Sequence, residues 1–234
     1  MKKSQLFMVH LLTRTLLFLT STSSQSQPTN NQSSNYSADL PVLLSFKSLI
    51  TSDPTKALSS WSWDPARNDT NTVPVPDYCE WTGVSCSNRR HPGHVTAIRL
   101  DGLGLAGTIC PQLGNLTRLR VLSLSANNLQ GEIPGTLGAC TSLHALDLSG
   151  NYLYGSMPAS LGLLSNLTSL NVTHNNLTGD IPMSFSNLTA LTNLSMRSNN
   201  FHGQIPSWLG NLTSLTRLGL AQNSFSGHLS PALG

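Results

Sequence analysis

Charged side chains are scarce in this sequence, in which Asp, Glu, Lys and Arg make up 10% of 234 residues. Soluble domains typically carry about a quarter. The formal net charge is +3, but three of the 13 basic residues, Lys2, Lys3 and Arg14, lie in the first 24 residues, which contain no acid. The remaining basic residues equal the acidic ones in number. A chain without a basic stripe is not expected to bind nucleic acid.

Cysteines are also few, and the 4 that are present do not form a metal-binding pattern. Cys79 and Cys86 lie close together in a chain that looks exported, which predicts a disulfide between them. The alternative is half of a metal site, but no second Cys or His pair lies at ligand spacing. Cys110 and Cys140 lie at different points of the repeat described below and are not expected to reach each other. We therefore expect no metal and no cofactor.

No group of residues in the sequence has the spacing of a catalytic site. The histidines considered for this role are scattered: His91, His94, His144, His174, His202 and His228. None is placed by its spacing beside a carboxylate or a reactive cysteine, as nucleophilic or acid–base catalysis requires. We predict no catalytic residues and expect that the chain is not an enzyme.

Long hydrophobic runs are absent except near the N-terminus. There Lys2 and Lys3 precede an apolar stretch from Leu6 to Leu19, and small polar residues follow. This order is typical of a secretory signal peptide, which we place at residues 1–24. The alternative is a signal anchor that stays in the membrane, although the stretch is shorter than the ~20 residues of a spanning helix. Residues 25–36 are polar and low in complexity, and we expect a disordered linker there.

Acceptor sequences for N-glycosylation are frequent and support export independently. These N-x-S/T sequences begin at Asn31, Asn35, Asn68, Asn115, Asn166, Asn171, Asn176, Asn187, Asn193 and Asn211. Any one of them arises easily by chance in Asn- and Ser-rich sequence. Together, behind a signal-like start, they favour a glycosylated protein that is secreted to the cell surface or the extracellular space.

A period of 24 residues runs through residues 95–234. It is clearest in the asparagines Asn127, Asn151, Asn175, Asn199 and Asn223. Such a period indicates a stack of identical units, each burying its apolar side against its neighbours. We call each unit a coil; the six coils begin at Val95, Leu119, Leu143, Leu167, Leu191 and Leu215, and the last is incomplete.

Each coil opens with the pattern L-x-x-L-x-L, which alternates as a short half-buried strand does. The second and third apolar positions are predicted to point inward, from Leu122 and Leu124 in coil 2 to Leu218 and Leu220 in coil 6. The repeated Asn side chains are predicted to bond backbone groups that the turns leave without partners. That role is structural, and it makes these asparagines unsuitable as a ligand site.

Residues 37–94 precede the coils and follow another pattern. The apolar residues from Leu40 to Ile50 have helical spacing, Ser37 or Asp39 could cap the helix, and Asp53-Pro54 ends it. The predicted disulfide follows, and we expect it to close the exposed end of the coil core. This segment is therefore predicted to be an N-terminal cap.

The pattern L-x-x-L-x-L-S-x-N-x-L-x-G-x-I-P-x-x-L-G-x-L-x-x resembles the plant-specific class of leucine-rich repeat, as in LSLSANNLQGEIPGTLGACTS (122–142). The segments ADLPVLLSFKSLITSDP and CEWTGVSC resemble the cap that precedes such repeats in plant receptor-like kinases and receptor-like proteins. The resemblance covers residues 37–234. It implies an α/β solenoid: a right-handed superhelix with a concave parallel β-sheet and a second short strand at the x-G-x-I-P segment.

The sequence departs from this pattern in several places. Leu103 stands where the first Asn would be, and Cys110 replaces the Pro of the I-P step. The sequence stops at Gly234, inside the sixth coil and without the C-terminal cap of the family. It contains no kinase-type glycine loop or catalytic loop. We expect the N-terminal part of a larger ectodomain, or a truncated product without independent function.

Ligands of solenoids usually lie on the concave sheet. The charged candidates there are Arg99, Asp101, Asp147, Arg197 and Arg217, among small hydroxyl-bearing residues. Aromatic anchors are missing from this face, which favours a merely solvated surface over a binding surface. Tyr152, Tyr154 and Trp208 lie off the face and are predicted to serve packing.

The leading functional hypothesis is a non-catalytic extracellular recognition module in signalling or defence. Its expected partners are a peptide or protein ligand and a receptor kinase co-receptor. Membrane attachment would come only from a downstream segment or a partner. The alternative is a secreted inhibitor resembling polygalacturonase-inhibiting proteins, which needs about ten coils and a C-terminal cap.

Overall fold

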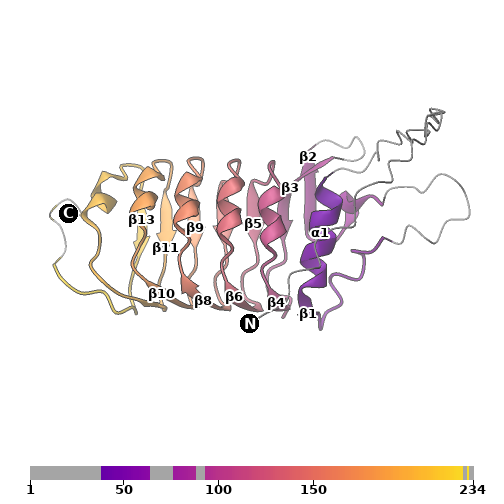
Figure 1. Ribbon diagram of the computed structural model, residues 1–234, viewed down its shortest axis with the longest axis horizontal. Helices are drawn as coiled ribbons and strands as arrows, with labels where there is room; N and C mark the ends of the chain where they lie inside the picture. Colours follow the sequence, from indigo (N-terminus) through magenta and orange to yellow (C-terminus); the bar gives the residue numbers. More distant parts are fainter. Residues whose placement is uncertain (1–37, 64–75, 88–92, 229–230, 232–234) are drawn as a thin grey trace, which may run out of the picture. The chain divides into compact units, whose positions relative to one another are not determined.

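The computed structural model describes residues 38–63, 76–87, 93–228 and 231, which all belong to one compact unit. The predicted signal peptide, the predicted linker and the acceptors Asn31, Asn35 and Asn68 lie outside the described residues. So do the last three residues of the chain. The described part is a stack of coils preceded by a helical cap (Figure 1).

Each of the first five coils gives one strand to each of two sheets, and the sixth gives β13. In order across the seven-stranded sheet, the strands are β13 (Arg217–Gly219), β11 (Asn193–Ser195), β9 (Ser169–Asn171), β7 (Ala145–Asp147), β5 (Val121–Ser123), β3 (His94–Arg99) and β2 (Val84–Ser87). Across the six-stranded sheet they are β1 (Ile50–Ser52), β4 (Ala106–Thr108), β6 (Asn128–Glu132), β8 (Tyr152–Ser156), β10 (Asn176–Gly179) and β12 (Asn200–Phe201). Strands of neighbouring coils pair in parallel, so Leu122 lies beside Leu146 and Leu146 beside Leu170.

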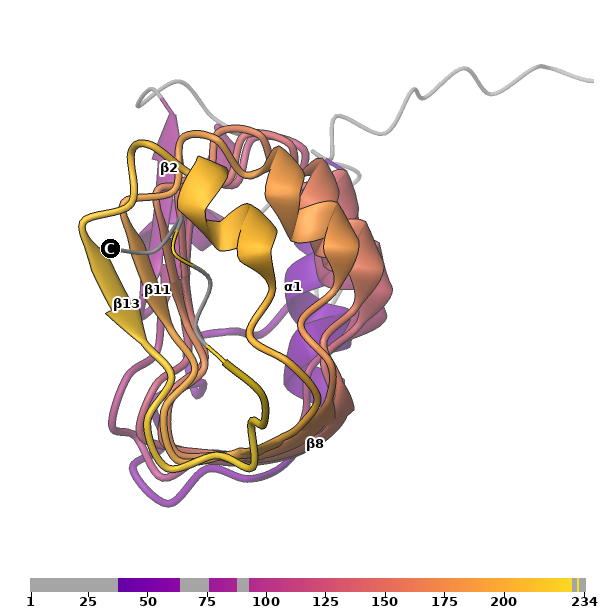
Figure 2. The same ribbon diagram turned by 90° about the vertical axis from the view of Figure 1, so that its left-hand side faces the viewer.

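Short 3-10 helices form the third side of the stack, as the view along it shows (Figure 2). They are η3 (Pro111–Asn115), η4 (Gly135–Ala139), η5 (Ala159–Leu163), η6 (Met183–Asn187) and η7 (Ser207–Asn211). In coils 2 to 5 the residue before each helix is a proline, whose ring fixes the backbone angle there. The 24-residue pattern did not predict these helices.

Glycines in the 3-10 helices let successive coils approach closely. A Cβ on Gly114 or Gly138 would lie 2.3 Å from a backbone carbonyl oxygen of the next coil, and one on Gly162 would lie 2.4 Å away. Such distances are far shorter than a van der Waals contact. In coil 4 this place is taken by Ser186, and η6 and η7 pack less closely than the pairs before them.

The core is a ribbon of apolar side chains enclosed by these three sides. Leu122, Leu146 and Leu170 are buried, as the alternating pattern predicted. For coil 6 that prediction was wrong: Leu218 is 39% exposed and Leu220 is half-buried. The reason is that each coil is covered by its neighbour, and no described coil packs on the outer edge of β13.

The repeated asparagines fasten neighbouring coils together, which confirms their predicted role. Asn127 is 5% exposed, and its Oδ1 accepts hydrogen bonds from the backbone N–H groups of Leu103 and Leu105 at 3.1 and 2.9 Å. Its Nδ2 donates to the carbonyl oxygens of Leu100 and Leu124 at 2.7 and 3.0 Å. Each amide therefore satisfies backbone groups of its own coil and of the preceding one. Asn151, Asn175 and Asn199 repeat this arrangement.

The cap helix α1 (Asp39–Ser48) begins where it was predicted but ends earlier. Ile50, expected in the helix, lies in β1 and pairs with Gly107 of β4. Asp39 does not cap the helix, because Ala38 holds that position without a side-chain bond. Instead, the buried Asp39 carboxylate accepts a hydrogen bond from the N–H of Val95 at 2.7 Å, which joins the cap to the first coil.

The cap also covers one edge of each sheet. β1 pairs antiparallel with β4, and β2 pairs antiparallel with β3, so both sheets begin with a cap strand. The disulfide Cys79–Cys86 is present and links the 3-10 helix η2 (Tyr78–Glu80) to β2. Behind it, Trp61 and Trp81 stack with ring centroids 5.7 Å apart. The predicted role of the disulfide, closing this end of the core, thus agrees with its position.

Candidate functional site

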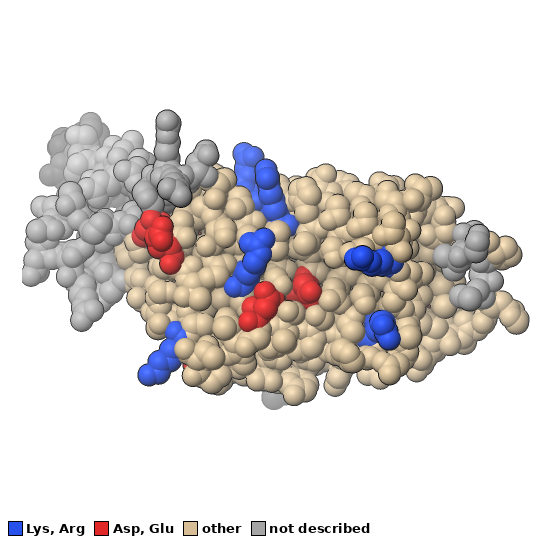
Figure 3. Space-filling view, turned by 180° about the vertical axis from the view of Figure 1, so that it is seen from behind, with Lys and Arg blue, Asp and Glu red and all other residues tan. Residues whose placement is uncertain are grey.

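The outer face of the seven-stranded sheet carries one short column of side chains from each coil. Charged side chains are few on this face, and some basic and acidic ones lie close together near its middle (Figure 3). Arg99, Arg197 and Arg217 are exposed, and within the described residues no carboxylate forms an ion pair with any of them. Arg99 and Asp147 belong to β3 and β7, with β5 between them, so they do not meet.

The two predicted carboxylates are held by neighbouring hydroxyl groups. Asp101 accepts hydrogen bonds from Ser123 and from both the N–H and the Oγ of Ser125. Asp147 accepts from the N–H of Ser149 at 3.0 Å and from the Nδ2 of Asn171 at 3.1 Å. Both acids therefore stabilise the ends of their strands. They line none of the hollows described below.

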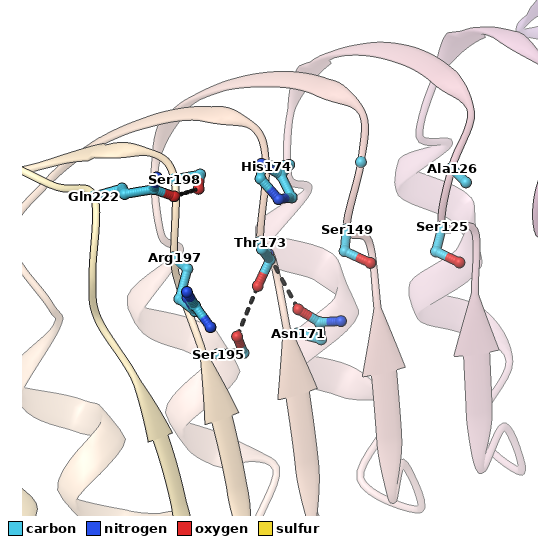
Figure 4. Close-up of a pocket in the computed structure, with 11 residues that line it drawn as sticks. Ser125, Ala126, Ser149, Asn171, Thr173, His174, Ser195, Arg197, Ser198 and Gln222 are labelled. Carbon is cyan, nitrogen blue, oxygen red and sulfur yellow. Dashed lines mark hydrogen bonds between the residues drawn. The ribbon is translucent and has the colours of Figure 1, made fainter.

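A shallow open hollow of about 450 Å³ lies at the ends of the strands of coils 2 to 6 (Figure 4). Across its floor, Asn171 accepts a hydrogen bond from the N–H of Thr173 at 3.2 Å, and Thr173 Oγ1 lies 2.7 Å from Ser195 Oγ. His174 and Arg197 border it. The lining is mostly neutral hydroxyl and amide groups, and Arg197 is the one cationic side chain among the lining residues.

A second hollow of about 540 Å³ lies beside the first, over β9, β11 and β13, and contains both Arg197 and Arg217. Gly219 makes room for Arg197: a Cβ on Gly219 would lie 3.0 Å from Arg197 Cγ and 3.1 Å from its Cδ. The arginine side chain thus rests on the bare backbone of the next strand. The two hollows share Arg197, Asn171 and Ser195.

Arg99 lies in a third and smaller hollow, of about 360 Å³, at the cap end of the same face. Its lining includes Ser85 and Cys86 of β2 and Arg120 of coil 2. The structure therefore separates the five predicted binding residues. Arg197 and Arg217 come together, Arg99 is apart from them, and the two acids serve the scaffold.

The glycosylation acceptors in the described part differ in how accessible they are. Asn115, Asn166, Asn176, Asn187 and Asn211 are exposed, although the Nδ2 of Asn166 donates to the carbonyl oxygen of Thr141 at 2.9 Å. Asn171 and Asn193 are half-buried on the seven-stranded sheet. The Asn171 Nδ2 donates to Asp147, so a glycan on this nitrogen would leave it one N–H for that bond and would crowd the surrounding side chains.

The chemistry of the remaining titratable groups is limited. The described residues contain no group of three or more His, Cys, Asp or Glu that could hold a metal ion. Cys110 and Cys140 are free and buried; burial raises the pKa of the Cys110 thiol, and it raises the pKa of the Cys140 thiol to about 11. Thiols with raised pKa are poor nucleophiles at neutral pH. None of the helices in the described part has the length and apolar composition of a membrane-spanning segment.

Two aromatic residues contradict the prediction that they serve packing. Tyr152 and Tyr154 are 59% and 54% exposed on the outer face of the six-stranded sheet. Trp208, in contrast, is buried as predicted. The alternation of β8 signalled this orientation, because Leu153 between the two tyrosines is fully buried and its neighbours must then point outward.

Comparison with known proteins agrees with this architecture. Residues 99–233 match the family described as leucine-rich repeat region, and residues 37–87 match the leucine-rich repeat N-terminal domain. The chain belongs to the leucine-rich repeat family. A probable leucine-rich repeat receptor-like protein kinase of Arabidopsis thaliana is 40% identical over 127 residues, which are 54% of this chain and 15% of that protein. The match thus spans only a small part of that kinase.

Solved leucine-rich repeat structures from Arabidopsis thaliana have the same fold. The ectodomain of the receptor kinase GASSHO1/SCHENGEN3, in complex with Casparian strip integrity factor 2, superposes with a TM-score of 0.72 at 39% identity, over 82% of this chain and 22% of that one. A chain of the BIR3–SERK2 complex superposes with a TM-score of 0.69 at 33% identity, over 81% of this chain and 95% of that one. This leucine-rich repeat chain is therefore similar to plant receptor ectodomains.

Proposed function

We propose that this chain is the N-terminal part of a plant receptor-like protein or receptor-like kinase. It acts outside the cell, without catalysis, and recognises a peptide or protein ligand. The observation that carries the proposal is the pair of open hollows that share Arg197 and include Arg217. The GASSHO1 ectodomain, a similar structure, is in complex with Casparian strip integrity factor 2, which supports a ligand-binding role.

The shape of the hollows suits an extended chain that crosses the strands. Parallel strands lie about 4.8 Å apart, so a ligand crossing them meets a new coil every one or two of its residues. The hydroxyl and amide groups on the floor can donate to and accept from a peptide backbone. Such a ligand needs no deep apolar pocket, and the hollows offer none.

The two arginines of the second hollow would orient the proposed ligand. Arg197 and Arg217 form no ion pair with a described residue, and both lie toward the C-terminal coils. A guanidinium group binds a carboxylate through two parallel hydrogen bonds. We place an acidic side chain or the terminal carboxylate of the ligand there. A receptor kinase co-receptor is a second proposed partner, because the BIR3–SERK2 complex is among the similar structures.

A binding assay with synthetic peptides tests this proposal. The secreted chain is titrated against a library of ten-residue peptides that carry either a free carboxylate or an amide at the C-terminus. We expect micromolar binders whose affinity falls about 10-fold or more on amidation or with Arg197→Gln, since a charge-assisted hydrogen bond contributes about 1.5–3 kcal/mol. Arg99→Gln, in the separate hollow, is the matched control and should leave the affinity unchanged. The proposal is wrong if no peptide binds at high micromolar concentration, or if Arg197→Gln and Arg99→Gln reduce the affinity equally.

A further inference from the structure

Tyr152 and Tyr154 form an exposed aromatic pair on the six-stranded sheet. In the described part of the chain, every other aromatic side chain is buried or half-buried. Two residues apart on one strand, the rings point to the same side, while Leu153 points into the core. Each of these tyrosines leaves a large apolar ring in contact with water.

The strand beside them places a sequon in register with the second ring. Asn176 of β10 is the direct partner of Tyr154 in the parallel ladder. Leu177, which follows Asn176, is fully buried, so Asn176 points outward on the same face as Tyr154. Side chains directly opposite on neighbouring strands have their Cβ atoms about 5 Å apart. The side chains of Asn176 and Tyr154 therefore leave the sheet side by side on the same face.

Asn176 is well suited to carry a glycan in the folded protein. Asn176 and Thr178, the two recognition residues of the sequon, are both exposed. Among the described residues, none forms a hydrogen bond with the Asn176 amide. Asn171, whose Nδ2 donates to Asp147, differs in this respect. A sugar on Asn176 replaces one amide hydrogen without disturbing any bond of the scaffold.

We propose that Asn176 carries an N-linked glycan whose first N-acetylglucosamine packs on the ring of Tyr154. The donor is an oligosaccharide joined to a polyprenyl diphosphate. The bond between C1 of its first sugar and the diphosphate oxygen breaks, the bond between C1 and Asn176 Nδ2 forms, and the amide loses one proton as the lipid diphosphate leaves. The reaction needs no oxidant or reductant.

Packing of the sugar on the ring gives the glycan a defined place. One face of N-acetylglucosamine presents C–H groups, which match the electron-rich face of an aromatic ring. The glycan removes the Tyr154 ring from water and shields Tyr152 beside it. This part of the six-stranded sheet, around β8 and β10, is thereby shielded by the chain's own sugar. This inference rests on the export that is part of the proposed function.

Peptide mass spectrometry of the secreted glycoprotein tests the modification, and tyrosine nitration tests the contact. The glycans are trimmed enzymatically to one N-acetylglucosamine per site, and the protein is treated with tetranitromethane. We expect Asn176 to be occupied, and Tyr154 to be nitrated about 3-fold or more faster in Asn176→Gln than in the glycoprotein. The thermal midpoint should be about 2–4 °C lower in Asn176→Gln than in the wild type. In a protein that already carries Tyr154→Ala, adding Asn176→Gln should lower the thermal midpoint by much less, because the ring on which the sugar packs is absent.

Asn187→Gln is the matched control, because Asn187 is exposed at the end of η6 and begins a sequon as Asn176 does. Removing the Asn187 glycan should leave the rate of Tyr154 nitration unchanged. An unmodified Asn176 beside an occupied Asn187 would overturn the inference alone. Absence of glycans at every acceptor would overturn it together with the proposed export. Equal nitration of Tyr154 with and without the Asn176 glycan would also overturn it.

Discussion

Replacing Gly138 by alanine should force two coils apart. Gly138 lies in η4, and an added Cβ would lie 2.3 Å from the carbonyl oxygen of Ser160 and 2.7 Å from its carbonyl carbon. An ordinary contact is about 3.4 Å or longer, so η5 must move away by about 1 Å. Both neighbouring atoms belong to the backbone, so no side-chain rotation can relieve the clash.

The expected cost is about 3 kcal/mol. Overpacking a well-packed core costs about 1–3 kcal/mol, and a gap of about 1 Å sacrifices up to half of the dispersion energy of the contacts that separate. We take the upper end because the interface between coils is a main source of stability in a solenoid. For a chain of this size, that corresponds to about 6–12 °C in the thermal midpoint.

Gly135→Ala is the matched control on the same 3-10 helix. There the nearest atom to an added Cβ is the Ser160 Oγ at 3.2 Å, which can shift by a few tenths of an ångström. Alanine also reduces the entropy of the unfolded chain, so the net change should stay within about 1 kcal/mol. Circular dichroism during thermal and urea unfolding measures both variants. If Gly138→Ala unfolds no earlier than Gly135→Ala, the close-approach reasoning is wrong.

Two further predictions concern buried polar groups. Asn151→Asp should lower the free energy of unfolding by about 3–5 kcal/mol, because a carboxylate cannot donate to the three carbonyl oxygens that the Asn151 Nδ2 now reaches. The control is Asn128→Asp, on the surface, which should change the free energy of unfolding by less than about 1 kcal/mol. Urea titration measures both variants. The second prediction concerns pH. Burial raises the pKa of the Cys140 thiol from 9.0 to about 11, so the thiol stays protonated in the folded state. The stability that this thiol contributes is therefore complete below pH 9.0 and is lost as the pH rises toward about 11. Over that pH range the free energy of unfolding should fall by on the order of 2 kcal/mol more in the wild type than in Cys140→Leu, which has the leucine that neighbouring coils carry at this position. If urea titrations show the same fall in both proteins, the prediction is wrong.

The repeating part of the fold could be predicted because one physical solution recurs in every coil. The alternation around Leu146 predicted a strand with one buried face, and the Asn period predicted amides that bond the turns. The disulfide Cys79–Cys86 followed from spacing and the expectation of export. Each of these signals is local, and stacking repeats it without new information.

Features that depend on the ends and outer layers could not be predicted in this way. Ile50 has helical spacing, yet it joins β1 because the edge beside Gly107 offers backbone hydrogen bonds. Leu218 follows the same pattern as Leu146 but is exposed, because burial depends on the neighbouring coil. The alternation around Leu153 assigns Tyr152 and Tyr154 to the opposite face of their strand, but whether another element covers that face depends on the six-stranded sheet, and there both rings are exposed. In each case the deciding contact lies outside the residue's own coil.

The candidate site owes its shape to the same bonds that hold the stack. Lining and fastening residues alternate along each turn: His174 borders the hollow and Asn175 fastens the coil, and Ser198 and Asn199 repeat this order. His174 and Ser198 have positive φ angles of 55° and 52°, which turn the chain so that the following Asn points inward. The proposed ligand would therefore contact side chains that are adjacent to these hydrogen-bonded asparagines. Because that backbone repeats from coil to coil, the proposed recognition must come from the side chains that differ, and in the second hollow these include Arg197 and Arg217, with Gly219 beneath Arg197.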